Sequence, residues 1–174
     1  MPLPATQAML RSIAYQTMLA GGLGGYMYGS NYYDLHSGWE TGIDSPGVTY
    51  LGYWRSLFAG LAWYNLVPDQ TNTVVVAGYG TFTGNSGNIQ TDNYVTTSSA
   101  ADGSLIVSYC PVPSTITVDM TKMRGPVTAQ WYDPTNCAFQ VISGSPFPNT
   151  GTQNFTTPGP NSAGDSDWVL VLLN

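Results

Sequence analysis

The segment Leu19–Asp34, LAGGLGGYMYGSNYYD, combines five glycines with four tyrosines. Glycine-rich runs bind phosphate where they join a strand to a following helix, with a lysine or an acidic ribose ligand at a suitable distance. Here the glycines follow a predicted helix and precede a predicted strand, and the first lysine is Lys122. The segment therefore argues against a nucleotide site. Two interpretations stay open: close packing of helix and strand, or a strand whose end opens into a binding loop.

The acidic residues Asp34, Glu40 and Asp44 lie close together in the sequence. Glycoside hydrolysis generally needs an acid and a second carboxylate on either side of the scissile bond, and in barrel enzymes these come from different strands. We therefore interpret the three residues as solvated loop carboxylates. His36, with Ser37 beside it, is weak evidence for a triad, because triads are assembled across a fold. We predict no catalytic residue in this chain.

Cys110 and Cys137 have no CxxC spacing, and His36 is the single histidine, so a zinc site is not expected. The two thiols could form one disulfide in a secreted chain, or they could be two separate buried thiols. The run Gly164–Asp167, GDSD, could hold calcium with loop carbonyls, but we interpret it as a polar turn before a strand. We predict neither a metal nor a cofactor.

The composition excludes several classes of partner. Charged residues make up 8% of the chain, compared with about a quarter in a typical soluble domain. The net charge is -6 and Lys and Arg number four, too few to neutralise a row of phosphates, so neither nucleic acid nor an anionic membrane is an expected partner. The glycines after Ala20 interrupt the first apolar run before it reaches about twenty residues, so no membrane insertion is predicted.

The first part of the chain, residues 1–66, has helical periodicity. Pro4–Ala20 has apolar residues at helical spacing and ends at a pair of glycines, as a helix does. The aromatic run Gly25–Gly29 predicts one buried strand. A long polar loop follows, and Thr49–Leu66 then gives the strongest helical pattern of the chain. The order is therefore helix, strand, long loop, helix.

The second part, residues 67–174, changes to a period of two, which is typical of strands. Asp-Gly within Ala101–Ser104 and the proline within Tyr132–Asn136 predict two hairpins. Trp168–Leu173 is apolar on both faces and predicts a central strand. The predicted strands are Thr73–Ala77, Tyr94–Ser99, Ser104–Cys110, Thr115–Met120, Val127–Tyr132, Ala138–Ile142, Gln153–Thr156 and Trp168–Leu173. Short strands with frequent turns predict a mainly β chain that ends in an antiparallel β-sandwich.

A family resemblance follows from five motifs in order: RSIAYQTMLAGGLGGYMYGSN, YLGYWRSLFAGLAWYNLVPDQ, DGSLIVSYCPVPSTITVDM, AQWYDPTN and DWVLVL. Together they resemble the C-terminal part of apiosidase-like glycoside hydrolases, a (β/α)8 barrel family whose barrel precedes a small β-sandwich labelled as collagen-binding. The resemblance implies that residues 1–66 are a partial barrel segment, a helix-strand-helix remnant with the last strand and two helices. It implies that residues 67–174 are the sandwich. Cys137 stands where the family pattern has a turn glycine.

The resemblance also implies substrate-contacting residues at the end of the predicted barrel strand. The family motif after this strand is Tyr-Gly-His-Asn followed by an aromatic residue; here it begins at Tyr28 and ends at Asn31, with a serine in place of the histidine and tyrosines after it. The candidate substrate-binding residues are Tyr28, Asn31, Tyr33 and Asp34. Trp39 joins them on its own chemistry, as a loop tryptophan suited to stacking on a sugar ring.

A (β/α)8 barrel takes about 200 residues or more, and 66 residues precede the predicted sandwich. We therefore expect a non-catalytic, C-terminal portion of a carbohydrate-active enzyme, with carbohydrate and the missing barrel portion as partners. The alternative is a stand-alone, self-associating structural or extracellular protein that binds glycan or matrix. We expect an extracellular or periplasmic location, although Arg11 lies within the first apolar region and no signal peptide is recognisable.

Overall fold

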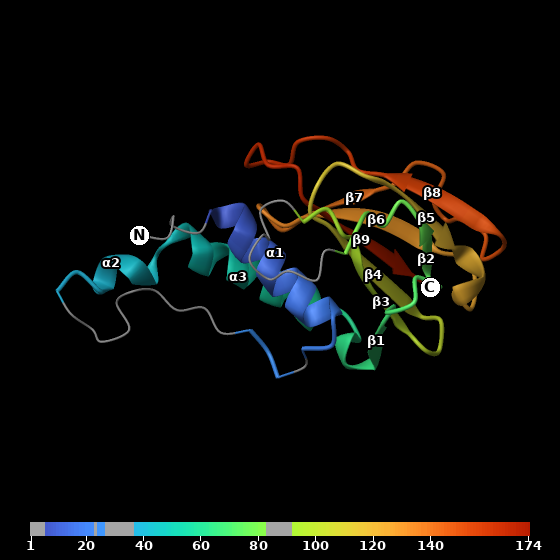
Figure 1. The fold of residues 1–174 in the computed structure, drawn as a ribbon, viewed down its shortest axis with the longest axis horizontal. Coiled ribbons are helices and arrows are strands. Elements are labelled where there is room, and N and C mark those ends of the chain that lie inside the picture. The colour runs from blue at the N-terminus through green and yellow to red at the C-terminus, as the bar shows by residue number, and fades with distance from the viewer. Residues whose placement is uncertain (1–5, 23, 27–36, 83–91) are drawn as a thin grey trace.

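The computed structural model describes residues 6–22, 24–26, 37–82 and 92–174. Its helices and strands follow the order drawn in Figure 1. They are α1 (Gln7–Leu19), α2 (Glu40–Ile43), α3 (Pro46–Ala59), η1 (Trp63–Asn65), β1 (Leu66–Pro68), β2 (Val75–Ala77), β3 (Thr96–Ala100), β4 (Leu105–Cys110), β5 (Thr115–Asp119), η2 (Met120–Lys122), β6 (Thr128–Asp133), β7 (Ala138–Val141), β8 (Thr152–Thr156) and β9 (Trp168–Leu173). The predicted strand at residues 25–29 lies for the most part outside the described residues.

The strands form two antiparallel sheets that face each other, which confirms the predicted β-sandwich. One sheet has six strands in the order β1-β3-β4-β9-β6-β7, and the other has three in the order β2-β5-β8. β9 lies between β4 and β6 and pairs antiparallel with both, so Trp168–Leu173 is the central strand that its sequence predicts. Both predicted hairpins are present, since β3 pairs with β4 and β6 pairs with β7.

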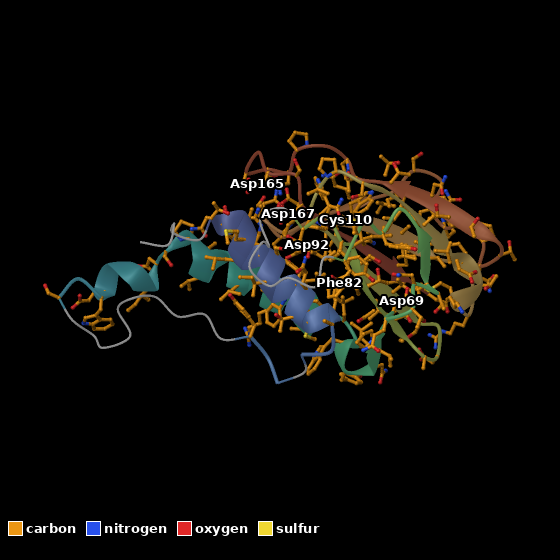
Figure 2. All side chains as sticks on the ribbon, viewed as in Figure 1. Asp69, Phe82, Asp92, Cys110, Asp165 and Asp167 are labelled. Atoms are coloured by element: carbon orange, nitrogen blue, oxygen red, sulfur yellow. The ribbon has the colours of Figure 1, made fainter. Side chains whose placement is uncertain are left out.

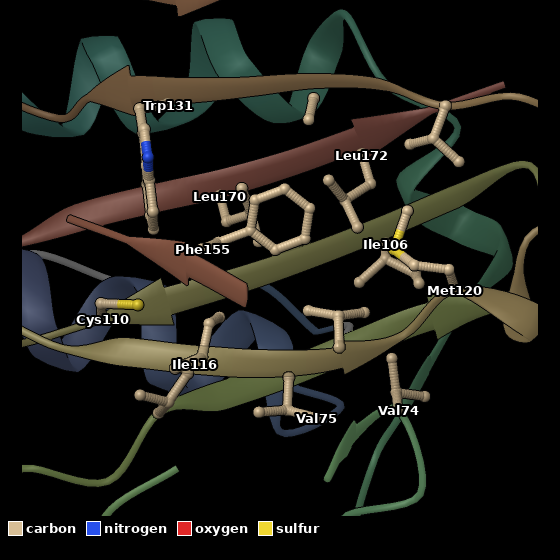
Figure 3. Close-up of a cluster of buried hydrophobic side chains, with 14 of the residues drawn as sticks. Val74, Val75, Ile106, Cys110, Ile116, Met120, Trp131, Phe155, Leu170 and Leu172 are labelled. Carbon is tan, nitrogen blue, oxygen red and sulfur yellow. The ribbon is translucent and has the colours of Figure 1, made fainter. Parts of the chain in front are cut away.

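The space between the two sheets is filled by a core of buried apolar side chains. Figure 3 shows Trp131 and Leu170 of the larger sheet pointing toward Ile116 and Phe155 of the smaller one. β5 alternates as predicted, because its Ile116 and Val118 are buried while its other residues are not. This face of the larger sheet therefore belongs to the sandwich interior.

The opposite face of the six-stranded sheet is covered by helices, which makes a third layer. α1 and α3 lie side by side against this face (Figure 1). β9 serves both layers because its side chains alternate: Leu170 and Leu172 enter the inter-sheet core, whereas Val169 and Val171 enter the core under the helices. The continuous apolar sequence of β9 is thus explained by a strand that is buried on both faces.

The helix predicted at Thr49–Leu66 corresponds to α3, which differs from the prediction at both ends. α3 begins at Pro46 and ends at Ala59, where the sequence pattern predicts Thr49 to Leu66. Proline suits the first helical position because it needs no hydrogen-bond acceptor there, and Gly60 caps the helix at its other end. The chain then turns and forms β1, which pairs with β3. Beyond Gly60 the chain therefore leaves the helix that its periodicity predicts, and Leu66–Pro68 pairs with the edge of the sheet instead.

The tight β3–β4 hairpin depends on a glycine. Gly103 has φ +70°, and a Cβ atom there would lie 2.7 Å from the backbone nitrogen of Arg124. Asp102 accepts hydrogen bonds from the backbone N–H and the hydroxyl of Ser104 in the same turn. The Asp-Gly pair is thus required both for the backbone conformation and for the close approach of a neighbouring segment.

Among the helices that the structure describes, none has the length and apolarity needed to cross a bilayer.

Candidate functional site

A buried ion-pair cluster connects the helical layer to the sandwich. Arg11 lies in the middle of α1 and its side chain is 1% exposed. Its Nε donates to Asp167 Oδ2 at 2.9 Å, and its Nη2 donates to Asp167 Oδ1 at 2.7 Å. The same Nη2 donates to Asp165 Oδ2 at 2.7 Å. Two parallel bonds between a guanidinium and a carboxylate are among the strongest and most directional polar contacts in proteins.

Asp167 is itself held by the sheet and by the loop before β9. Tyr109 of β4 donates its hydroxyl to Asp167 Oδ2 at 3.1 Å. Asn161 donates its amide to Asp167 Oδ1 at 3.0 Å and to the backbone carbonyl of Asp167 at 3.1 Å. Figure 2 shows Asp165 and Asp167 beside α1, at the end of the sandwich that faces the helices. The carboxylate thus receives donors from three segments: a helix, a strand and a loop.

Two members of the cluster, Arg11 and Tyr109, have shifted pKa values. Burial by itself lowers the pKa of Arg11, but the hydrogen bonds and the charge of Asp167, together with Asp165, outweigh it and hold that pKa above its ordinary value. Burial first, and then the charge of Asp167, raises the pKa of Tyr109 well above its ordinary value. Arg11 is therefore a cation and Tyr109 a neutral donor. This arrangement suits a structural contact between α1 and the sandwich better than a site of proton transfer.

A layer of aromatic side chains surrounds the ion pair. The ring of Tyr15 stacks on that of Tyr109, with centroids 5.0 Å apart and planes 7° from parallel. The ring of Phe58 on α3 also packs against that of Tyr15, with centroids 6.1 Å apart. The guanidinium of Arg11 lies 4.7 Å from the ring centroid of Tyr50, also on α3. Both helices are therefore involved in enclosing the charged group.

Two further hydrogen bonds attach the helix backbones to the sheet. Ser98 of β3 donates its hydroxyl to the carbonyl of Leu19 at 2.6 Å, at the end of α1 where carbonyls lack partners within the helix. Tyr132 of β6 donates its hydroxyl to the carbonyl of Tyr53 on α3 at 2.8 Å. Both contacts reach across the shared core. We call the cluster around Arg11 and Asp167, together with these two bonds, the joint.

The sequence did not predict the joint, and it predicted a different use for its acidic residues. Asp165 and Asp167, which form the GDSD motif with Gly164 and Ser166, bind a guanidinium instead of making a simple polar turn. The buried face of α1 includes the polar residues Arg11 and Ser12, while the apolar residues Met9 and Ile13 are half-buried. An arginine within an apolar helical pattern was the available signal, since such a residue needs a buried partner.

The predicted substrate-binding loop lies for the most part outside the residues that the structure describes. Tyr28, Asn31, Tyr33 and Asp34 lie outside the described residues. Trp39 is half-buried and immediately precedes the short helix α2, which lies at the end of the molecule away from the sandwich (Figure 1). Their sugar-contacting role stays a prediction. Glu40 and Asp44, at the two ends of α2, are exposed. His36 lies outside the described residues.

The two cysteines are free thiols on opposite faces of the six-stranded sheet. Cys110 is buried in the core between the sheets, and Cys137 packs, half-buried, against the core under the helices. The disulfide that the sequence left open is therefore not formed in this structure, because the sheet itself separates the two side chains. Cys137 has φ +66°, a conformation that glycine adopts more easily.

Comparisons with known proteins agree with this architecture. A solved structure described as a glycoside hydrolase matches 98% of this chain and 37% of its own, with a TM-score of 0.77 and 21% identity. A glycoside hydrolase family 5 protein from Bacteroides vulgatus ATCC 8482 matches 97% of this chain and 36% of its own, with a TM-score of 0.74 and 18% identity. At these identities the likeness shows a shared fold, which includes the helices as well as the sandwich.

The chain spans little more than a third of each of these two proteins, at 37% and 36% of their lengths. A comparison with curated proteins found no match. A family model does match residues 82–173, which make up more than half of the chain and most of the sandwich. The chain belongs to the family described as "Putative collagen-binding domain of a collagenase".

Proposed function

We propose that this chain is the accessory, non-catalytic C-terminal portion of a carbohydrate-active enzyme of the apiosidase-like (β/α)8 type. In this proposal the helical segment is the last unit of a catalytic barrel, and the joint holds the β-sandwich on it in one orientation. The proposal places the enzyme outside the cell or in the periplasm, with carbohydrate as the partner of the whole protein.

One observation carries the proposal: the helical segment and the sandwich share a buried ion pair and an apolar core. Arg11 on α1 and Asp167 before β9 are joined by two short hydrogen bonds at a site closed to water. Two independent domains joined by a flexible linker would need no buried ion pair between them. The match of two glycoside hydrolases to 97% and 98% of this chain supports the same association of helices with sandwich in larger enzymes.

The test is to sequence the reading frame upstream of Met1 and to assay two proteins on a panel of aryl glycosides. The proposal expects upstream βα units that supply two carboxylates, hydrolysis by the protein made from the whole reading frame, and none by residues 1–174 alone. Hydrolysis by residues 1–174 alone would contradict the non-catalytic assignment. An upstream region without βα units would contradict the barrel assignment.

A second candidate function has its own supporting observation. Met18, Trp54, Phe58 and Trp63 line a hollow of about 300 Å³ on the helical layer. A stand-alone structural or binding protein could cover this apolar surface by pairing with a second copy, because monomers rarely leave large apolar patches exposed. Light scattering on purified residues 1–174 distinguishes the two. A dimer that Trp63→Ser dissociates favours self-association, whereas a stable monomer argues against it.

A further inference from the structure

A groove runs along the C-terminal end of α1, where this helix meets β1 and β3. Its volume is about 330 Å³, and small-molecule sites generally measure about 300–1,000 Å³. Residues from separate parts of the chain line it, among them Gln16, Leu19, Pro68, Phe82, Asp92 and Tyr94. Figure 2 shows Asp92, Phe82 and Asp69 following one another along this region. Neither Arg11 nor Asp167 is among the described residues that line the groove.

One part of the groove is aromatic. The side chain of Phe82 is 72% exposed, which is unusual for a phenylalanine. Its ring meets that of Tyr94 edge to face, with centroids 5.5 Å apart, and Tyr94 in turn meets Tyr79 at 6.2 Å. The hydroxyl of Tyr94 donates to Asn72 Oδ1 at 2.9 Å, which fixes the second ring. An exposed ring held beside a fixed one offers a flat apolar surface to a ligand.

The other part of the groove supplies hydrogen-bonding groups. Gln16 Nε2 is buried and has no hydrogen-bond partner among the residues that the structure describes. Asp92 is half-buried and accepts a bond from the backbone N–H of Tyr94 at 2.9 Å through Oδ1. Asp69 differs, because its carboxylate already accepts bonds from the backbone N–H groups of residues 73–75. Gln16 and Asp92 are therefore the groups suited to meet a ligand.

Charge narrows the class of ligand. Two carboxylates line the groove, and no lysine or arginine is among its described lining residues. A phosphate, sulfate or uronate would approach these carboxylates without a compensating cation, so an anionic ligand is disfavoured. A neutral ligand with an apolar face and several hydroxyl donors satisfies both the aromatic and the polar parts.

We propose that this groove binds a neutral saccharide. One sugar ring packs against the exposed face of Phe82, and its hydroxyls donate to Asp92 and accept from Gln16. A proline-rich polypeptide fits the polar part less well, because proline lacks the N–H that a carboxylate needs as a donor. Asp92 would then be covered without a partner, which is costly. The inference gives the proposed accessory function its ligand class and rests on that function for its biological meaning.

The experiment uses residues 1–174 and Phe82→Ala. A glycan array first selects neutral oligosaccharides, and calorimetric titration and amide chemical-shift mapping then measure the best of them. A tetragalacturonate and a (Pro-Pro-Gly)10 peptide serve as the anionic and proline-rich probes. Phe139→Ala is the matched control, because Phe139 is also an exposed phenylalanine, at 48%, but lies on β7 outside the groove. Thermal unfolding verifies that both variants fold.

The expected result is a neutral oligosaccharide whose shifts map to Gln16, Asp92 and Tyr94. Phe82→Ala should weaken its binding at least about tenfold, while Phe139→Ala leaves it unchanged. The proposal is overturned if no neutral saccharide binds, if both variants bind as the wild type does, or if the proline-rich or anionic probe takes the groove instead. Saccharide binding without hydrolysis by the whole reading frame would refute the proposed function alone, and hydrolysis without groove binding would refute this inference alone.

Discussion

Arg11 and Asp167 stand 156 residues apart in the sequence and form a two-bond ion pair in the interior. The pair connects the middle of α1 to the start of β9, the central strand of the larger sheet. Through Tyr109 it also contacts the neighbouring strand β4. Because β9 forms part of both cores, a movement of α1 would disturb the helical layer and the sandwich together.

Replacing Arg11 by methionine should strongly destabilise the protein. The change leaves Asp167 buried without its cation, and loss of one partner of a buried pair costs about 3–5 kcal/mol of unfolding free energy. Urea unfolding followed by tryptophan fluorescence measures the effect. Arg124→Met is the control, since Arg124 forms an exposed pair with Asp102 at 3.4 Å and its loss should change the free energy of unfolding far less. Equal losses in the two variants would show that the joint adds little.

Tyr109 contributes to the joint through both its hydroxyl and its ring. Tyr109→Phe removes one hydrogen bond to Asp167 and should cost about 1 kcal/mol of unfolding free energy. Tyr109→Ala also removes the stack on Tyr15 and leaves a cavity, so a loss of about 3–5 kcal/mol is expected. Both values come from urea unfolding. If Tyr109→Phe is as unstable as Tyr109→Ala, the hydroxyl and not the ring makes the main contribution of Tyr109 to stability.

Acid should weaken the fold through Asp133. Burial alone would raise the pKa of this carboxyl, but hydrogen bonds from Thr135 and Ser162 outweigh burial and lower it. A lowered folded-state pKa gives stability that is present above the unfolded-state pKa of about 4 and is lost as the pH falls through the folded-state pKa. Asp133→Asn should therefore be less stable near neutrality and should lose less on acidification.

The measurement is the free energy of unfolding from about pH 6 to about pH 2. An Asp133→Asn profile parallel to the wild type would contradict this assignment.

The two thiols should differ in reactivity. Burial raises the pKa of Cys110 to about 12, so its thiolate is scarce at neutral pH and its side chain is covered. Ellman's reagent should modify Cys137 slowly in the native protein and both thiols after unfolding without reductant. Cys137→Ser should remove the native reaction. Failure of both thiols to react in the unfolded, unreduced protein would indicate a disulfide and contradict the structure.

The sandwich could be predicted from sequence because its signals are local. The period of two identified the strand within Thr115–Met120, and Asp-Gly before Ser104 identified a hairpin. The continuous apolar run Trp168–Leu173 identified the central strand. These patterns are set by side-chain period and turn chemistry, which residues close in sequence determine.

The parts that could not be predicted depend on distant partners. The end of α3 at Ala59 depends on β1 pairing with β3, some thirty residues later. The burial of Arg11 depends on Asp167, and the groove depends on α1 lying beside Phe82 and Asp92. Helical periodicity and composition contain no information about such pairs. The residues Tyr28, Asn31, Tyr33 and Asp34 still stand as a prediction from resemblance.

The most direct measurement is amide hydrogen exchange of the native chain, because the central claim is that α1 and the sandwich form one body. The interior amides of α1 should exchange as slowly as those of β4 and β9, and Arg11→Met should speed exchange in α1 before it affects the strands. Fast exchange of α1 in the wild type, with β4 and β9 still protected, would contradict the claim.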